Sequence, residues 1–190
     1  MDIIDHGIFT LEINGNVASM NFNPANAKYP VELIESSFTR ERDNLLKIIG
    51  YKWAPEVLEI NPYTKRISFK WYNNTCENTL PENWKEQLHN IVCDLHRERI
   101  YKPNFYPKCF YVDSNNIVHA FVFYSTSSYD EQPISMDFYK PILNDDRLSL
   151  VEQLSTDGKL DMSILIKHAF NDYIVWPDNV LTDIYQKVYL

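Results

Sequence analysis

Residues 101–125 read YKPNFYPKCFYVDSNNIVHAFVFYS, and this stretch decides how the rest of the chain is interpreted. A short polar run with two prolines is followed by an apolar strand (109–113), a turn at 113–116 and a second apolar strand (117–124). The turn residues are Asp, Ser and Asn, whose side chains hydrogen-bond the nearby backbone and favour reversals. The stretch therefore predicts a loop followed by a β-hairpin, with the layout of a catalytic loop.

The first seventy residues predict a β-rich part. Residues 8–22 form apolar runs on both sides of Asn14-Gly15, which is a strong hairpin signal. Two further runs, 56–60 and 66–72, are rich in residues that favour strands and are joined by a turn.

Helical spacing of apolar residues appears in the remaining parts. A helix is predicted over 36–49, where Ser36 or Ser37 can cap it. A long amphipathic helix is predicted over 81–97, directly before the opening stretch. The last part of the chain has helical patterns at 147–155, 160–173 and 178–189.

This order predicts an α+β fold in one domain, 1–190, built from two lobes. The first lobe, 1–75, is small and β-rich with one helix. The second lobe, 76–190, is short and mainly helical. A chain of 190 residues that is 45% hydrophobic can bury a substantial core.

The order of elements resembles the protein kinase-like fold, and the opening stretch resembles its catalytic loop. Kinase loops read H-R-D-x-K-x-x-N, followed by a strand, a turn, a second strand and D-F-G. On this sequence Asn104 falls on the aspartate, Tyr106 on the lysine and Cys109 on the asparagine. Val122-Phe123-Tyr124 falls on D-F-G.

The resemblance continues towards the N-terminus, over roughly residues 8–125 in all. Val17-Ala18-Ser19-Met20 resembles V-A-I-K, so Met20, or Asn21 if the register slips by one residue, occupies the position of the strand lysine. Glu41 in the helix 36–49 corresponds to the ion-pairing glutamate.

The chemistry of the family does not carry over to these positions. Asn104 cannot accept a proton as a carboxylate can, and Val122 has no donor atom for a metal. Cys109 offers sulfur, whereas Mg²⁺ prefers oxygen. The chain has four glycines and no glycine-rich loop. The resemblance therefore implies a degraded, pseudokinase-like protein that is inactive, has no cofactor and acts by binding or regulating another protein.

Two alternatives remain open. The first is a divergent phosphotransferase that uses acidic residues outside the standard positions, such as Asp113, Asp130 or Asp137, and the second is a structural or assembly component. ATP binding without turnover is a further possibility for an inactive kinase-like protein. The compact form, low in Gly and rich in Asn, Tyr and Ile, resembles small kinase-like proteins of viral or phage genomes.

Composition narrows the class of partner. A net charge of −8 argues against sequence-independent binding of nucleic acid and suits a basic protein surface. No apolar run is long enough to span a bilayer and the N-terminus lacks a basic signal-peptide start, so no membrane association is expected. Three cysteines without a CxxC pair favour free thiols and a cytoplasmic location.

Two further sets of residues are candidates for binding. His89, Cys93 and His96 follow one another at helical spacing in 81–97, but the outer two are about 10.5 Å apart along the axis, so one metal ion is not expected to reach all three. Tyr106 and Tyr124 are candidates for a contact surface, because tyrosine is favoured at protein interfaces.

Overall fold

The computed structural model describes residues 1–5, 7–23, 29–102, 107–121, 123, 127–128, 134–135, 159–160 and 176–189. The chain divides into two compact units. The first unit consists of Met1–Glu82 and Lys108–Tyr124, and the second of Asn83–Pro107 and Ser125–Leu190. Both helices and strands are present, so the predicted α+β class is confirmed. In the described parts of the chain no helix is long and apolar enough to cross a membrane.

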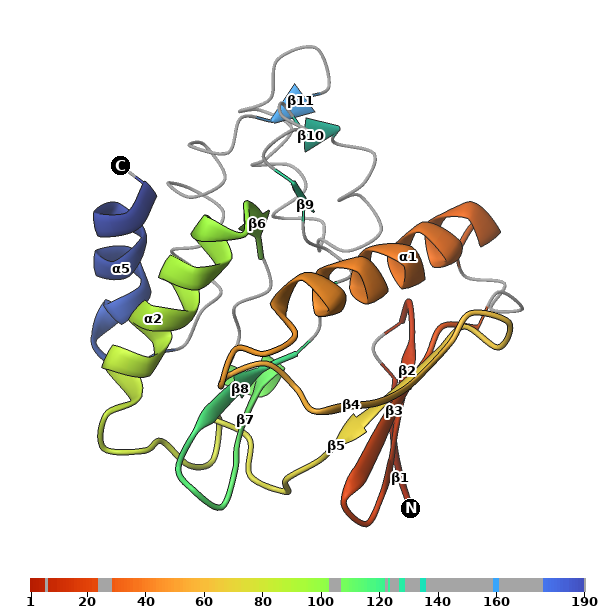
Figure 1. Ribbon diagram of the computed structural model, residues 1–190, viewed down its shortest axis with the longest axis horizontal. Coiled ribbons are helices and arrows are strands. Elements are labelled where there is room, and N and C mark those ends of the chain that lie inside the picture. Colours follow the sequence, from red (N-terminus) through yellow and green to blue (C-terminus); the bar gives the residue numbers. More distant parts are fainter. Residues whose placement is uncertain are drawn as a thin grey trace. The chain divides into compact units, whose positions relative to one another are not determined.

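The first unit contains a five-stranded antiparallel sheet with the order β1-β2-β3-β5-β4 (Figure 1). The hairpin predicted over 8–22 is confirmed, although its two-residue loop is Gly15-Asn16, one residue later than expected. The first strand was missed, because four residues with two adjacent isoleucines show no alternation. The strands are β1 (Asp2–Asp5), β2 (Thr10–Asn14), β3 (Val17–Asn21), β4 (Val57–Asn61) and β5 (Arg66–Lys70).

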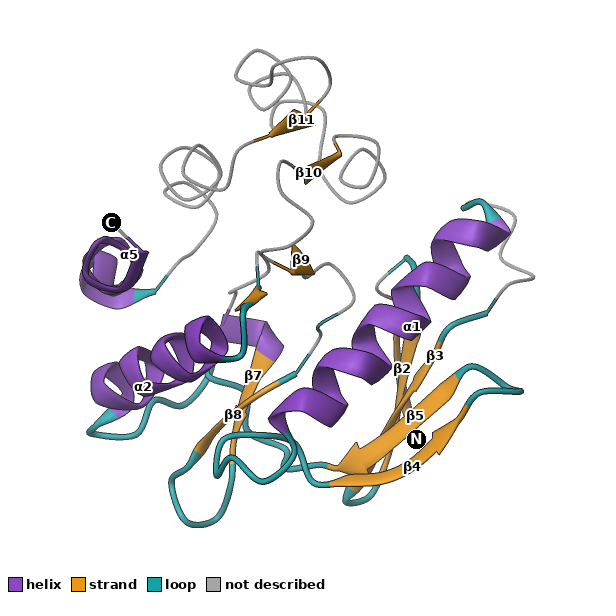
Figure 2. Ribbon diagram, turned by 45° about the horizontal axis from the view of Figure 1, so that its top comes forward, coloured by secondary structure: helices purple, strands orange, loops and turns teal. Residues whose placement is uncertain are grey.

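Helix α1 (Val31–Ile48) lies along this sheet, as Figures 1 and 2 both show. The Phe38 ring packs edge-on against Phe22, with 5.8 Å between the centroids. The predicted start at residue 36 is wrong, because the Pro30 carbonyl already accepts the N–H groups of Leu33 and Ile34. Ser36 is not a cap, since its hydroxyl donates to the Leu33 carbonyl inside the helix.

The hairpin predicted from the opening stretch is also present in the first unit. A short 3₁₀ turn, η1 (Pro107–Cys109), leads into β7 (Phe110–Val112), which pairs antiparallel with β8 (Val118–Ala120). The Ala120 N–H donates to the carbonyl of Trp53, in the connection between α1 and β4. The hairpin is therefore attached to the segment that follows α1.

The second unit contains α2 (Trp84–Arg97) and α5 (Val180–Tyr189) side by side (Figure 1). Trp84 stacks on Trp176 at 5.7 Å, and Lys85 pairs with Asp178 at 2.6 Å. The helix predicted over 81–97 begins three residues later than expected, and the last predicted helix is confirmed apart from its first turn, which is the 3₁₀ turn η5 (Pro177–Asn179). The two-stranded pairs of this unit are β6 (Ile100–Tyr101) with β9 (Ser127–Ser128), and β10 (Ile134–Ser135) with β11 (Lys159–Leu160).

The helix predicted over 147–155 lies outside the described residues, as does the helix over 160–173 except for its first residue. That residue, Leu160, is in β11.

Candidate functional site

Glu41 is buried at the centre of α1, with no solvent-exposed surface. Its Oε2 atom accepts the backbone N–H of Phe123, which follows β8 and is also fully buried. Burying a carboxylate is costly unless hydrogen bonds compensate for the lost hydration. This contact therefore joins α1 to the end of the hairpin. It engages one carboxylate oxygen of Glu41, the residue that the kinase resemblance places at the ion-pairing position.

Met20, at the position of the strand lysine, is fully buried in the sheet. It pairs in register with Leu11 and Ile67, so its neighbours across both strands are apolar. Its side chain lies on the same face as that of Phe22, the residue directly after β3, whose ring contacts α1. Asn21 points to the opposite face, and its side-chain amide donates to the carbonyl of Ser19 at 3.4 Å.

Cys109 is the other expected site residue that the structure describes near the hairpin. It is buried, and its carbonyl accepts the N–H of Phe121 at 3.1 Å. Asn104 and Tyr106, in the loop before it, lie outside the described residues. Val122 and Tyr124, at the end of the hairpin, do so as well.

Asp113 and His119 form a polar pair within the hairpin that the sequence interpretation did not predict. Asp113 Oδ1 accepts the N–H groups of Asn115 at 2.8 Å and Ile117 at 2.9 Å, which closes the turn. Asp113 Oδ2 lies 3.3 Å from His119 Nε2, and His119 Nδ1 lies 3.0 Å from the Ala54 carbonyl oxygen. The His119 ring is thus held between the Asp113 carboxylate and the Ala54 carbonyl.

The environment of Asp113 favours its charged form. Burial alone would raise the pKa of the carboxyl group. The backbone N–H groups of Ile117 and Asn115 and the side chain of His119 outweigh it, and the pKa of Asp113 is lowered from its usual value. Both oxygens of Asp113 are thus engaged inside the hairpin.

Aromatic rings connect β5 and the residues after it to the hairpin. Tyr111 stacks on His119 at 4.9 Å, and Phe69 lies 6.4 Å from Tyr111. Phe69 and Trp71 also contact Phe121, at 5.9 and 5.5 Å. We call this set the aromatic cluster, and it consists of Phe69, Trp71, Tyr72, Tyr111, His119 and Phe121.

Tyr111 is the most enclosed polar member of the aromatic cluster. Its side chain has no exposed surface, and burial raises the pKa of its hydroxyl group. Among the described residues this hydroxyl has no hydrogen-bond partner. The ring is thus held by packing and not by its polar end.

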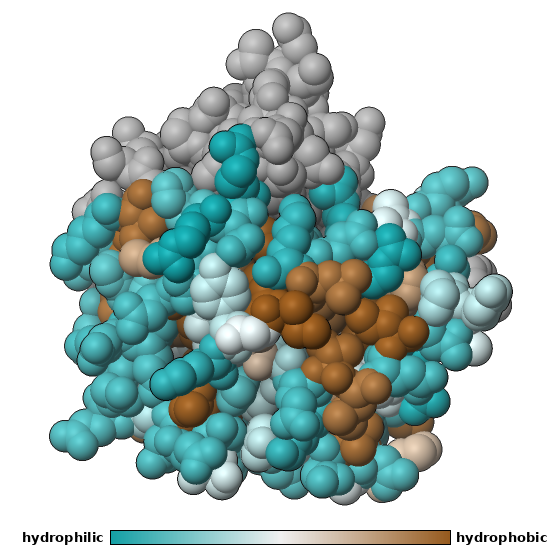
Figure 3. Space-filling view, in the orientation of Figure 1, coloured by the Kyte–Doolittle hydropathy of each residue, from teal (hydrophilic) through white to brown (hydrophobic). Residues whose placement is uncertain are grey.

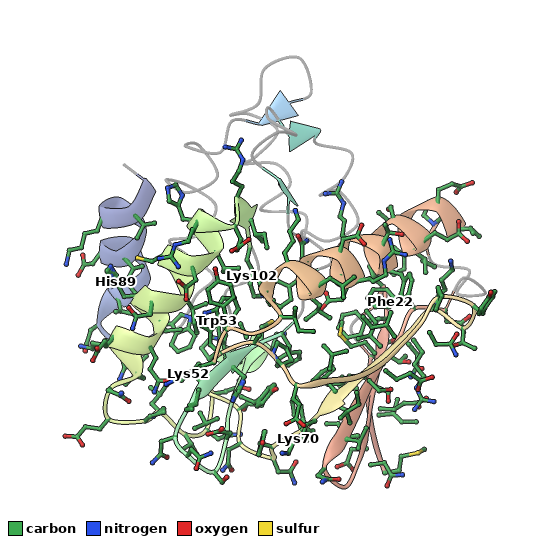
Figure 4. The ribbon with its side chains drawn as sticks, viewed as in Figure 1. Phe22, Lys52, Trp53, Lys70, His89 and Lys102 are labelled. Carbon is green, nitrogen blue, oxygen red and sulfur yellow. The ribbon has the colours of Figure 1, made fainter. Side chains whose placement is uncertain are left out.

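Of the three metal-capable residues in α2, His89 and Cys93 are in contact with each other. His89 Nε2 lies 3.6 Å from Cys93 Sγ, and Figure 4 shows His89 on α2. Within the part of the chain that the structure describes, no three His, Cys, Asp or Glu residues are grouped closely enough to hold an ion. His96 therefore does not complete a site with the other two.

Comparisons with known proteins give a likeness of fold. No protein-family model matches the sequence, and no curated protein matches it. A solved structure of WbdD with the kinase inhibitor LY294002 matches 98% of this chain with a TM-score of 0.53 and 10% identity. A second, of the bifunctional kinase-methyltransferase WbdD, matches 95% of this chain with a TM-score of 0.51 and 11% identity.

The chain spans less than half the length of these WbdD chains, 44% and 42%. At this level of identity the comparison concerns the fold alone. The α+β fold of this chain is therefore similar to a fold found in a protein with kinase activity among its functions.

Proposed function

We propose that this chain is a two-lobed, kinase-like protein that does not transfer phosphate and acts by binding another protein. The likeness to WbdD supports the kinase-like part of the proposal. The proposed lobes are 1–75 and 76–190. The inactivity and the binding role rest on the residues of the first unit.

The observation that carries the proposal is the state of Glu41. In kinases this glutamate pairs with a strand lysine, and that pair must be in place for catalysis. Here the lysine position holds the buried thioether of Met20. Glu41 accepts a backbone N–H from Phe123. A residue that would organise catalysis in an active kinase is used here to hold the hairpin on α1.

The aromatic cluster leaves no room for a nucleotide base between β5 and the hairpin. Phe69 and Trp71, from the sheet side, are in direct contact with Tyr111 and Phe121 of the hairpin. All four side chains are buried. A base cannot insert between rings that already touch without displacing packed aromatic groups, which is costly.

A group of exposed apolar side chains supports the binding role. Figure 3 shows apolar side chains gathered between α1 and β4. Leu46 and Ile49, at the end of α1, are 52% and 64% exposed, and Leu58 in β4 is 52% exposed. We call these three residues the apolar patch. Exposed apolar groups of this kind often mark protein-binding surfaces.

Three acidic residues are candidates for catalysis in the alternative, a divergent phosphotransferase, and the structure describes one of them, Asp113. Asp113 is engaged through both oxygens in the hairpin, so it is poorly suited to act as a base. Asp130 and Asp137 lie outside the described residues. The alternative therefore depends on those two positions.

Phosphate transfer and nucleotide binding test the proposal together. We expect the wild-type chain to show neither a shift of the melting temperature with Mg·ATP nor transfer of labelled phosphate to itself or to a generic substrate. Asp130→Asn and Asp137→Asn should leave this result unchanged, as should the exposed control Glu77→Gln. Transfer that Asp137→Asn abolishes and Glu77→Gln retains, with equal melting temperatures, would establish the phosphotransferase instead.

A further inference from the structure

Strand β1 is an edge of the five-stranded sheet (Figure 1). It pairs with β2 along its whole length in an unbroken register, from Asp2 opposite Ile13 to Asp5 opposite Thr10. No described strand pairs with its other side. Alternate N–H and C=O groups of β1 therefore point away from the sheet without a ladder partner in it.

The side chains of β1 are exposed to solvent, like the outer side of its backbone. All four residues are exposed, with Ile3 at 57% and Ile4 at 44%. Ile3 lies on the same face as Glu12, and Ile4 lies on the opposite face beside Leu11. An added strand would thus meet one isoleucine on each face.

The opposite edge of the sheet, β4, is less suited to receive a strand. Its pairing with β5 is interrupted by a register shift between Val57 and Glu59. Bulges of this kind twist an edge and are one of the ways in which proteins prevent edge-to-edge pairing. The regular edge of the sheet is β1.

The charges on β1 select the kind of strand that can bind. Asp2 and Asp5 flank the two isoleucines, and Glu12 lies directly across from Ile3 on β2. Among the described residues none of these three carboxylates has an ion-pair partner. Asp5 accepts the N–H of Gly7, at 2.7 Å. Among the described residues, the edge therefore carries unpaired carboxylates at both ends of a short apolar centre.

A second copy of this chain is a poor occupant of the edge. In an antiparallel pair of β1 strands centred between Ile3 and Ile4, Asp2 of each copy would face Asp5 of the other. Like charges directly opposite each other destabilise a strand pair. Opposite charges in the same places stabilise it, so the edge favours a basic strand.

We infer that β1 is a docking edge for an extended basic segment of another protein. The segment adds antiparallel to β1 as a further strand of the sheet, with two apolar residues opposite Ile3 and Ile4 and a Lys or Arg opposite both Asp2 and Asp5. Backbone hydrogen bonds supply the pairing, and the charges at each end supply the selectivity. This goes beyond the proposed function, since it holds whether or not the chain transfers phosphate.

Short peptides test this inference on the full-length chain with an untagged N-terminus. The probe is a fluorescent peptide of sequence Thr-Lys-Val-Val-Lys-Thr, and the control replaces both lysines with glutamate. We expect saturable binding of the lysine peptide by fluorescence anisotropy, weaker at high salt, and no binding of the glutamate peptide. Hydrogen exchange should slow at the β1 amides when the lysine peptide is bound.

Variants separate strand addition from unspecific attraction. Asp2→Asn with Asp5→Asn should weaken binding about fivefold, while Glu77→Gln with Glu82→Gln, which removes the same charge at exposed positions, should not. Two N-methylated lysine peptides, with the methyl groups on alternate residues, should differ, because only one set of amides faces β1.

Several results would overturn the inference. These are equal binding of the lysine and glutamate peptides, equal loss in both double variants, or equal binding of both N-methylated peptides. A dimer joined through β1, seen by sedimentation and not dissociated by the lysine peptide, would also do so, because it would make a second copy the occupant. Melting temperatures of all variants show that the fold is retained.

Discussion

At the scale of single residues, the candidate site is defined by side chains that bond backbone groups far away in the sequence. Glu41 and Phe123 are 82 positions apart, and His119 and Ala54 are 65 apart. In both contacts a side chain meets a backbone group that belongs to a different element. These contacts hold the hairpin to α1 and to the segment after it, so they contribute to stability.

The lowered pKa of Asp113 predicts a pH-dependent contribution to stability. A carboxyl group whose pKa is lower in the folded chain than in the unfolded chain stabilises the fold at pH values above its unfolded pKa, about 3.9. This contribution disappears as the pH falls through the folded value. We expect Asp113→Asn to lower the melting temperature by roughly 3 °C at pH 7, from a loss of about 1 kcal/mol.

The difference between wild type and Asp113→Asn should be constant from pH 7 to pH 5 and should shrink below about pH 4. Melting curves by circular dichroism across this range measure it. Asp43→Asn, which removes an exposed carboxylate beside Arg42, is the matched control and should have a small effect at every pH. A difference that grows as the pH falls would contradict the lowered pKa.

At the scale of elements, local signals predicted the fold where they act over a few residues. The Asn14-Gly15 signal placed the first hairpin to within one residue, because such a turn requires a positive φ, which Gly15 adopts at 61°. The start of α1 was missed because Ser36 looked like a cap, whereas the burial of Ile34 favours an earlier start.

The candidate site was less predictable than the fold for a physical reason. Spacing placed Glu41 on a helix and Met20 on a strand, and both elements exist. The partner of Glu41 could not be deduced, because the contact with Phe123 forms only after α1 and the hairpin have packed. The contacts of His119 were missed for the same reason, since one of its two ring nitrogens meets the Ala54 carbonyl, which is distant in the sequence.

The aromatic cluster gives a prediction at this scale, because Tyr111 links β5 to the hairpin. Tyr111→Phe removes a buried hydroxyl that has no partner among the described residues, and it should be neutral or raise stability by about 1 kcal/mol. Tyr111→Ala removes the ring contacts and should cost about 3–5 kcal/mol.

Urea denaturation midpoints with unchanged slopes measure both effects. Tyr63→Phe, at a side chain that is 95% exposed, is the control for loss of a tyrosine hydroxyl. A loss of more than about 1 kcal/mol in Tyr111→Phe would show that the hydroxyl is hydrogen-bonded in solution, for example to a buried water molecule.

At the scale of the whole molecule, the first unit has its stabilising side-chain contacts and its exposed apolar surfaces in different places. The aromatic cluster and Glu41 are enclosed, whereas the apolar patch and the β1 edge are open. The two open features differ in chemistry. The apolar patch offers side chains beside α1, while β1 offers backbone groups flanked by carboxylates, so the two surfaces are suited to different kinds of contact.

The apolar patch gives the prediction that decides the binding role. Leu46→Lys with Leu58→Lys should keep the melting temperature within about 2 °C, because both side chains are half exposed. Crosslinking in cells should recover a partner with the wild-type chain and reduce it about tenfold with this double variant. Tyr63→Lys, which adds a lysine at another exposed position, should retain the partner.

If the double variant retains the partner as well, the apolar patch is not the binding surface. If the wild-type chain instead forms a defined oligomer in sedimentation that the double variant disrupts, the patch joins copies of this chain, and an assembly component replaces the proposed binding protein.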